Sequence, residues 1–185
     1  SYNFSFFDPY ASKDGVSRGY NAYYRKTDFG EFNIANYLTN SYGVGIQFGY
    51  PLSDTQRVGL NLTYDSTDID IGTLPAREIW DFVNSEGEQF DTLSASFSWQ
   101  RVTLNRGTFP TDGSSTSLSL LTTLPSSDLN YYRISLNQKY YERIGASSLI
   151  FGFNGELGYL NAYGDTTEPP FFRNFYEGGP RSLRG

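Results

Sequence analysis

Three carboxylates stand close together in the chain, at Asp65, Asp68 and Asp70, and carboxylate oxygens are ligands that Ca²⁺ accepts. The segment lacks the turn glycine and the distal glutamate of a dedicated calcium loop, so a solvated acidic loop is the favoured interpretation. Because the chain contains no histidine and no cysteine, a Ser–His or Cys–His nucleophile and the usual zinc ligand sets are excluded. We therefore expect no enzymatic activity, no metal site and no cofactor.

Gly43 and Gly45 form the second pattern that could bind a ligand, since glycines let a backbone approach a phosphate group closely. No helix start follows them, although a helix N-terminus is the other half of such a site. The formal net charge of −6 and the scattered lysines and arginines argue against a nucleic-acid partner. The two glycines are better explained as small residues on one face of a strand.

The chain is rich in aromatic residues and glycine, with 16 Tyr, 15 Phe, 2 Trp and 19 Gly among its 185 residues. No stretch approaches the roughly 20 consecutive apolar residues of a membrane-spanning helix, and the mean hydropathy is −0.48. A helical membrane protein is therefore excluded. Two classes remain, a soluble all-β domain and a membrane β-barrel. In a barrel, apolar outward residues alternate with polar inward ones, so the mean hydropathy of the chain can be negative.

Apolar and polar residues alternate strictly in two segments, 41–51 and 57–65. The residues of one parity are apolar, namely Tyr42, Val44, Ile46, Phe48, Tyr50, Val58, Leu60, Leu62 and Tyr64. The residues of the other parity are mostly small or polar, and they include Gly43, Gly45, Gln47, Gly49, Gly59, Asn61 and Thr63. Since successive side chains of a strand point to opposite faces, both segments are predicted to be strands with one apolar face.

Six further segments alternate with lower contrast, which predicts eight strands in all; the six are 2–7, 16–27, 92–103, 117–124, 132–140 and 148–160. Short connections rich in Pro, Asp and Gly lie between them at 8–15, 51–56, 105–113 and 142–146. Because outer-membrane barrels have short periplasmic turns and longer extracellular loops, these four are assigned to the periplasmic side. In the longest link, 66–91, residues 75–83 predict a brief helix whose Trp80 packs inside the loop.

A soluble β-sandwich also alternates, but its outward face carries charged residues, whereas the polar face here is mostly Gly, Ser, Thr and Asn. Aromatic residues recur toward the strand ends, as in the interfacial girdles of a barrel. The pattern therefore favours an all-β, antiparallel transmembrane β-barrel. Its lipid face is predicted to carry Val44, Ile46, Phe48, Val58, Leu60 and Leu62, and its interior Gln47, Asn61 and Ser96.

Three motifs resemble those of the BamA family of outer-membrane assembly factors. Two resemble its periplasmic turns, and their marked residues are Asp8, Pro9, Asp14 and Gly15 in the first and Pro110, Asp112 and Gly113 in the second. The third runs from Asn174 into Leu183, Arg184 and Gly185, and it resembles the loop that carries the family's (Val/Ile)-Arg-Gly-(Phe/Tyr) motif. Leu183 departs from the usual β-branched residue, and the aromatic fourth position lies beyond Gly185.

The resemblance implies that residues 1–185 are one partial barrel domain, a fragment of a sixteen-stranded barrel. Its strands would span about 1–161, and residues 162–185 would form most of an extracellular loop. The family folds and inserts other outer-membrane proteins, so the implied partners are outer-membrane lipids, unfolded outer-membrane protein clients and the lipoproteins of the assembly complex. The fragment itself would be scaffold, and Arg184 would be held inside the barrel by groups on later strands.

Other classes stay open at this point: a passive outer-membrane pore, a barrel that assembles autotransporters, and a small lipid-modifying barrel. The lumen charges are spread over several strands rather than opposed at one constriction, which argues against a pore. An open sheet edge costs several kcal/mol for each unpaired backbone group in a bilayer. We therefore expect the first and last strands to pair in the isolated fragment, closing a narrow barrel and leaving the tail outside. The alternative is that two copies join their edges into a larger ring.

Overall fold

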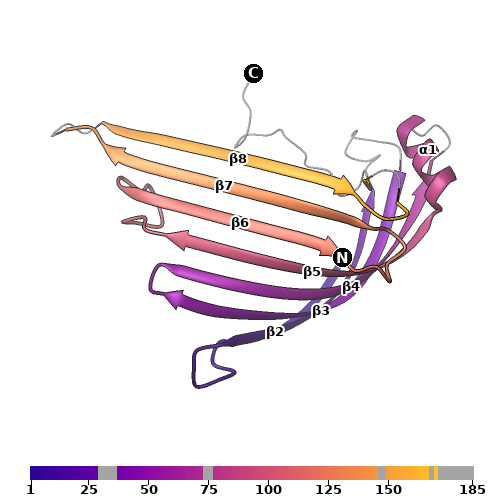
Figure 1. Cartoon of the computed structure of the whole chain (residues 1–185), viewed down its shortest axis with the longest axis horizontal. Helices are drawn as coiled ribbons and strands as arrows, with labels where there is room; N and C mark the ends of the chain where they lie inside the picture. The colour runs from indigo at the N-terminus through magenta and orange to yellow at the C-terminus, as the bar shows by residue number, and fades with distance from the viewer. Residues whose placement is uncertain (29–36, 73–76, 146–148, 167–168, 171–185) are drawn as a thin grey trace.

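The computed structural model describes residues 1–28, 37–72, 77–145, 149–166 and 169–170. Within them, eight strands form one antiparallel sheet in the order of the sequence (Figure 1). The strands are β1 Tyr2–Asp8, β2 Ser17–Asp28, β3 Tyr37–Ser53, β4 Gln56–Ile71, β5 Gln89–Val102, β6 Gly113–Thr123, β7 Tyr131–Arg143 and β8 Ile150–Ala162. The predicted all-β class and the number of strands are confirmed.

The register fixes which residues share a face. Gln47 pairs with Asn61, and Asn61 pairs with Ser96, so these three lie in one row on what we call the inner face. Ile46 pairs with Leu62 one residue away, on the opposite or outer face. The six residues predicted to face lipid all share this outer face, and the three predicted to face the interior share the inner one. The prediction of two distinct faces is therefore confirmed.

We call the two ends of the sheet the turn end, where β1–β2, β3–β4, β5–β6 and β7–β8 connect, and the loop end. At the turn end most strands begin or end close to their predicted bounds, but β6 begins earlier than predicted, at Gly113, and β7 ends later, at Arg143. At the loop end β3 and β4 extend much further than predicted, to Tyr37 and Ile71. Part of the predicted acidic loop is therefore strand, and Asp65, Asp68 and Asp70 all lie on β4.

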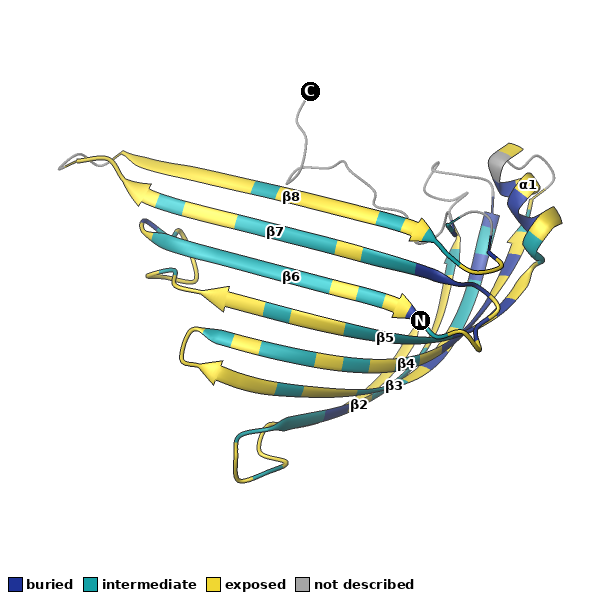
Figure 2. Cartoon of the chain, viewed as in Figure 1, coloured by how far each residue is buried: buried dark blue, intermediate teal, exposed yellow. Residues whose placement is uncertain are grey.

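Among the described residues there is one helix, α1 Arg77–Glu86, which lies at the loop end between β4 and β5 (Figure 1). Buried residues gather beside it (Figure 2) and form one apolar cluster: Tyr37, Ile69, Ile79, Phe82, Val83, Phe90, Leu129 and Tyr131. Trp80 was expected to pack in this loop, but its side chain is 51% exposed. Ile79, Phe82 and Val83 face the sheet instead because they share one side of the helix. No helix in the described part of the chain is long and apolar enough to cross a bilayer.

The sheet is open. Pairing runs from β1 to β8, and the described strands include no β1–β8 pair, so the expected closure is wrong for this structure. The sheet curves gently (Figure 1), and barrel diameter grows with strand number, so such a wall suits a wider ring. The start of the tail is attached at the loop end, because Thr166 accepts a hydrogen bond from the Asn130 backbone N–H at 2.8 Å. The rest of the tail, 171–185, lies outside the described residues.

Candidate functional site on the inner face

A hydrogen-bonded row crosses the inner face where Tyr23, Gly43 and Asp65 pair in turn on β2, β3 and β4. Gly43 leaves the Tyr23 ring room to lie over β3, since a Cβ there would come within 2.9 Å of that ring. The Tyr23 hydroxyl donates to one carboxylate oxygen of Asp65, and the Thr67 hydroxyl donates to the other at 3.0 Å. Asp65 is only 4% exposed. The buried carboxylate is thus satisfied by hydroxyl donors that join β2 to β4.

A second row contains only glycine and serine. It crosses β2 to β8 through Ser17, Gly49, Gly59, Ser98, Ser119, Ser135 and Gly158, each paired with the next. We call it the glycine–serine row. A Cβ at Gly49 would lie 2.6 Å from the Ser17 hydroxyl, and one at Gly59 would lie 2.7 Å from the Ser98 hydroxyl. Neighbouring side chains therefore lie flat over the glycines, and the row is a smooth floor.

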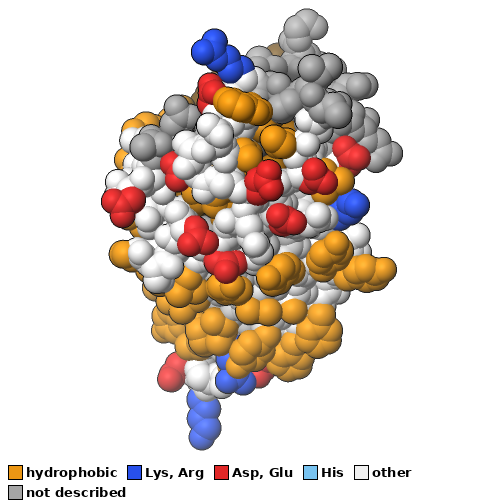
Figure 3. Space-filling model, turned by 90° about the vertical axis from the view of Figure 1, so that its right-hand side faces the viewer, with side chains coloured by type: hydrophobic (Ala, Val, Ile, Leu, Met, Phe, Trp, Pro, Cys, Tyr) orange, Lys and Arg blue, Asp and Glu red, His pale blue; other side chains and the backbone are white. Residues whose placement is uncertain are grey.

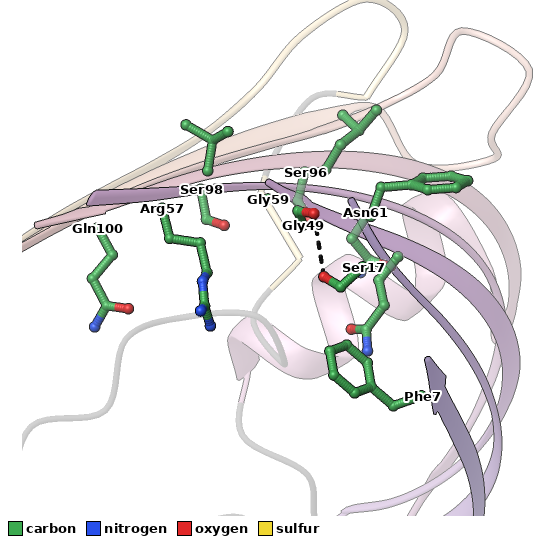
Figure 4. Close-up of a pocket in the computed structure, with 13 residues that line it drawn as sticks. Phe7, Ser17, Gly49, Arg57, Gly59, Asn61, Ser96, Ser98 and Gln100 are labelled. Atoms are coloured by element: carbon green, nitrogen blue, oxygen red, sulfur yellow. Dashed lines mark hydrogen bonds between the residues drawn. The ribbon is translucent and has the colours of Figure 1, made fainter. Parts of the chain in front are cut away.

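A pocket of about 240 Å³ lies over part of this floor. Arg57 and Gln100, which pair directly, point from the sheet toward the concave side, and Phe7 approaches from β1 (Figure 4). Gln47, Asn61 and Ser96 line the pocket on the other side of the floor. The guanidinium and the amides can donate several hydrogen bonds to a peptide or to water. The lining contains no nucleophile–base pair, so the geometry suits holding a polar group rather than catalysis.

The three aspartates that could have formed a calcium site do not converge. Asp65 points to the inner face, whereas Asp68 and Asp70 lie on the opposite parity of β4 and point outward. Acidic side chains cluster on this part of the outer surface, above a broad apolar band (Figure 3). Within the described residues no group of three or more potential ligands could hold a metal ion.

The first turn motif closes β1–β2. The Asp8 carboxylate accepts a hydrogen bond from the Tyr10 N–H at 3.0 Å, which places Pro9 inside a tight side-chain-capped turn. The Ser12 hydroxyl accepts from the Asp14 N–H at 3.2 Å. Gly15 has a φ of +81°, a conformation that residues with a Cβ rarely adopt. Sequence reasoning found Asp8, Asp14 and Gly15 but missed Ser12, whose hydroxyl group organises the turn.

The second turn motif closes β5–β6. Gly113 has a φ of +100°, and a Cβ there would lie 2.3 Å from the Thr103 carbonyl oxygen, so only glycine fits. The Asn105 side-chain oxygen accepts from the N–H groups of Thr111 and Asp112 at 3.1 and 3.3 Å. Pro110 precedes this capped segment. The two motifs lie at the same end of the sheet, but β3 and β4 separate them. The third motif, Leu183 to Gly185, lies outside the described residues.

An antiparallel sheet with an apolar outer band, aromatic residues along it and a small, polar inner face is the wall of a membrane β-barrel. Comparison with known proteins places this wall in a particular family. The model of the Omp85 superfamily domain matches residues 1–185, and the chain belongs to this superfamily.

Two relatives are similar over nearly the whole chain. The outer membrane protein assembly factor BamA of Neisseria meningitidis serogroup B (strain ATCC BAA-335 / MC58) is 33% identical over 193 residues, which cover 98% of this chain and 24% of that protein. The crystal structure of BamA from Haemophilus ducreyi lacking POTRA domains 1–3 matches with a TM-score of 0.86 and 31% identity, over 99% of this chain and 37% of that one. The chain thus spans about a quarter of the first relative and about a third of the second.

These matches establish three points about the chain. It is a BamA homologue, as its turn and loop motifs suggested. Its eight strands match part of the BamA barrel, and it is an outer-membrane protein. Membership of this superfamily also agrees with the expectation that the chain is not an enzyme.

Proposed function

We propose that this chain is part of the barrel wall of a factor that folds and inserts outer-membrane proteins, and that its own contribution is scaffolding. The observation that carries the proposal is the likeness to BamA over 98% of the chain, which includes both turn motifs. A smooth, polar inner face without a catalytic arrangement fits a wall rather than a reaction site. The unfolded clients and the assembly lipoproteins would then bind mainly outside these residues.

The turn and loop motifs gain roles under this proposal. Asp8, Pro9, Asp14, Gly15, Pro110, Asp112 and Gly113 would shape the periplasmic turns, where tight connections keep neighbouring strands in register. Residues 1–185 would form one part of a single sixteen-stranded barrel domain. Arg184 would lie inside that barrel, because a guanidinium taken out of water needs several acceptors. Those acceptors would belong to strands outside this chain.

A chimera tests the proposal. Residues 1–185 replace the matching segment of Neisseria meningitidis BamA in a strain whose own copy is repressed, and the amount of folded outer-membrane barrels is measured by heat-modifiable gel mobility. We expect the chimera to restore assembly, and Arg184→Ala in the same chimera to lower it. An equally long segment from a porin is the control and should not restore assembly.

Two results would contradict the proposal. The first is a chimera that reaches the outer membrane folded but leaves client barrels unassembled. The second is a large, steady and ion-selective current through the purified chimera in planar bilayers, which would favour a pore.

A further inference from the structure

The outer face carries an apolar notch centred on Ala22 of β2. Ala22 lies in register between Phe4 on β1 and Val44 on β3, so a small side chain sits between two large ones. The notch has a volume of about 540 Å³. Aromatic rings form most of its wall, and the wall residues on the outer face are Tyr2, Phe4, Tyr24, Tyr42, Val44 and Tyr64.

Two of the aromatic rings around this notch stack on each other, and several of the residues that line it are largely exposed. Tyr2 and Tyr24 stack with their ring centroids 6.5 Å apart. Tyr24 pairs with Tyr42, so both rings lie at the loop end of the notch. The side chains of Tyr2, Phe4 and Val44 are 79%, 70% and 56% exposed. In an outer-membrane protein, an apolar hollow on the outer face of a barrel strand is open to lipid rather than to water.

A lysine stands beside this notch. Lys26 follows Tyr24 by two residues on β2, so its side chain is on the same outer face, one step nearer the loop end. Its ammonium makes no ion pair with any residue that the structure describes. Two carboxylates share its surroundings on the outer face: Asp28 lies two residues further along β2, and Asp68 of β4 is separated from Lys26 in the register by Asn40. Lysines at the edge of a membrane extend their charged ends toward the lipid headgroups.

We propose that this notch binds one anionic membrane lipid, with an acyl chain over Ala22 and the lipid phosphate on Lys26. The aromatic walls supply apolar contact along the chain, and the tyrosine hydroxyls lie where the bilayer becomes polar. The unpaired ammonium supplies the charge that favours an anionic headgroup over a zwitterionic one. The site depends on the outer-membrane location of the chain and not on its role in assembly.

The same face provides a matched control. A second notch, of about 290 Å³, surrounds Ala95 on β5 and is walled by Leu60, Phe97, Leu120 and Ile134. Ala95 pairs with Leu62, just as Ala22 pairs with Val44, so the two alanines have similar settings. The outward side chains nearer the loop end on β5 are Leu93 and Asp91, and neither can bind a phosphate. Arg133 also contributes to the lining, but it pairs with Leu121, which pairs with Ser96, so it belongs to the inner face. The second notch therefore has the apolar hollow without a cation on the outer face.

Lipid binding can be measured on the protein with its complete barrel, in detergent, by native mass spectrometry. The probes are palmitoyl-oleoyl phosphatidylglycerol and phosphatidylcholine with the same chains. We expect the first phosphatidylglycerol to bind about fivefold more tightly than phosphatidylcholine, the equivalent of about 1 kcal/mol for one lysine. Lys26→Gln should remove this preference. Ala22→Leu, which fills the notch, should weaken binding of both lipids, and Ala95→Leu should leave the first binding event unchanged.

Heat-modifiable gel mobility verifies that each variant keeps a folded barrel. If Ala22→Leu does not fold, Lys26→Gln alone tests whether the notch prefers an anionic lipid. The proposal is overturned if Lys26→Gln keeps the full preference for phosphatidylglycerol. It is also overturned if a folded Ala22→Leu binds both lipids as the parent does, or if Ala95→Leu weakens the first binding event as strongly as Ala22→Leu. Because no step involves client proteins, these outcomes are independent of the assembly chimera.

Discussion

The two halves of the long strands have opposite polarity. In the apolar band, β4 points Leu60 and Leu62 outward and Asn61 inward. Only a few residues further along the same strand, Asp68 points outward and Ile69 is buried on the inner side at 1% exposure. The strand has not changed, but its surroundings have: lipid covers the outer face of the first half, and helix α1 packs against the inner face of the second.

The loop-end half is therefore built like a small soluble protein. Its core lies on the inner face, where Phe82 of α1 and Phe90 of β5 meet with ring centroids 5.8 Å apart. Its charged residues lie on the outside, where Figure 3 shows acidic side chains above the apolar band. Along one strand, the apolar residues therefore change from the outer face to the inner face where the surroundings change from lipid to helix α1.

The largest expected effect comes from the loop-end core. Phe90→Ala should destabilise this half by about 3–5 kcal/mol, because it removes a fully buried ring and leaves a cavity. Protease cleavage within α1 and amide hydrogen exchange at the loop end should both become faster. Phe97→Ala is the matched control on the same strand, since Phe97 lies in the outer band and is 41% exposed. Equal release of α1 by both variants would show that the loop end has no core of its own.

A positive charge placed on each half of β4 tests the polarity directly. Leu62→Arg should destabilise the barrel by about 2–4 kcal/mol if residue 62 lies near the middle of the bilayer. Asp68→Arg, six residues along on the same outer face, should cost only about 0–1 kcal/mol. Urea titration of the folded fraction in lipid vesicles measures both values. Similar costs at the two positions would mean that the apolar band does not end between them.

The smallest effect concerns the hydrogen-bonded row that joins the two halves on the inner face. Tyr23→Phe should cost about 1–3 kcal/mol, because it takes one hydroxyl donor away from the buried carboxylate of Asp65. Tyr24→Phe is the control, since the next residue points outward and is 42% exposed. The same urea titration applies. If the two variants are equally stable, the hydrogen bond from the Tyr23 hydroxyl to Asp65 makes no net contribution to stability, because water replaces it.

The sequence predicted the apolar half well, since lipid on one side and a polar interior on the other impose strict alternation on residues 41–51 and 57–65. The prediction of strand β4 stopped too early, at residue 65. Beyond it, residues that face helix α1 alternate with the outward residues Ser66, Asp68 and Asp70, and this acidic composition is typical of a solvated loop. The helix was predicted, but Trp80 was misplaced. The spacing of Ile79, Phe82 and Val83 already marks the buried stripe, and Trp80 lies outside it.

On the inner face, the predicted interior residues were correct, whereas the Tyr23–Asp65 contact was not found. Its signal was present, because Tyr23 interrupts the alternation and its partner on β3 is a glycine. Recognising it required the register, which places Gly43 between them. The open sheet was not predicted, because alternation along a strand shows which residues share a face and not whether the first and last strands of the sheet pair.

The glycine–serine row also affects how strands find their partners during folding. Strands that slip past each other by two residues keep the same faces, so only side-chain differences between successive rows reveal the error. The side chains of glycine and serine, a hydrogen atom and a hydroxymethyl group, differ little in size. The glycine–serine row therefore hardly distinguishes the correct register from a slipped one. That information must come from the aromatic pairs of the outer face, from the Tyr23–Asp65 contact and from the irregular pairing between Pro51 and Ser53. Misaligned refolding should accordingly be most frequent in variants that remove these few markers.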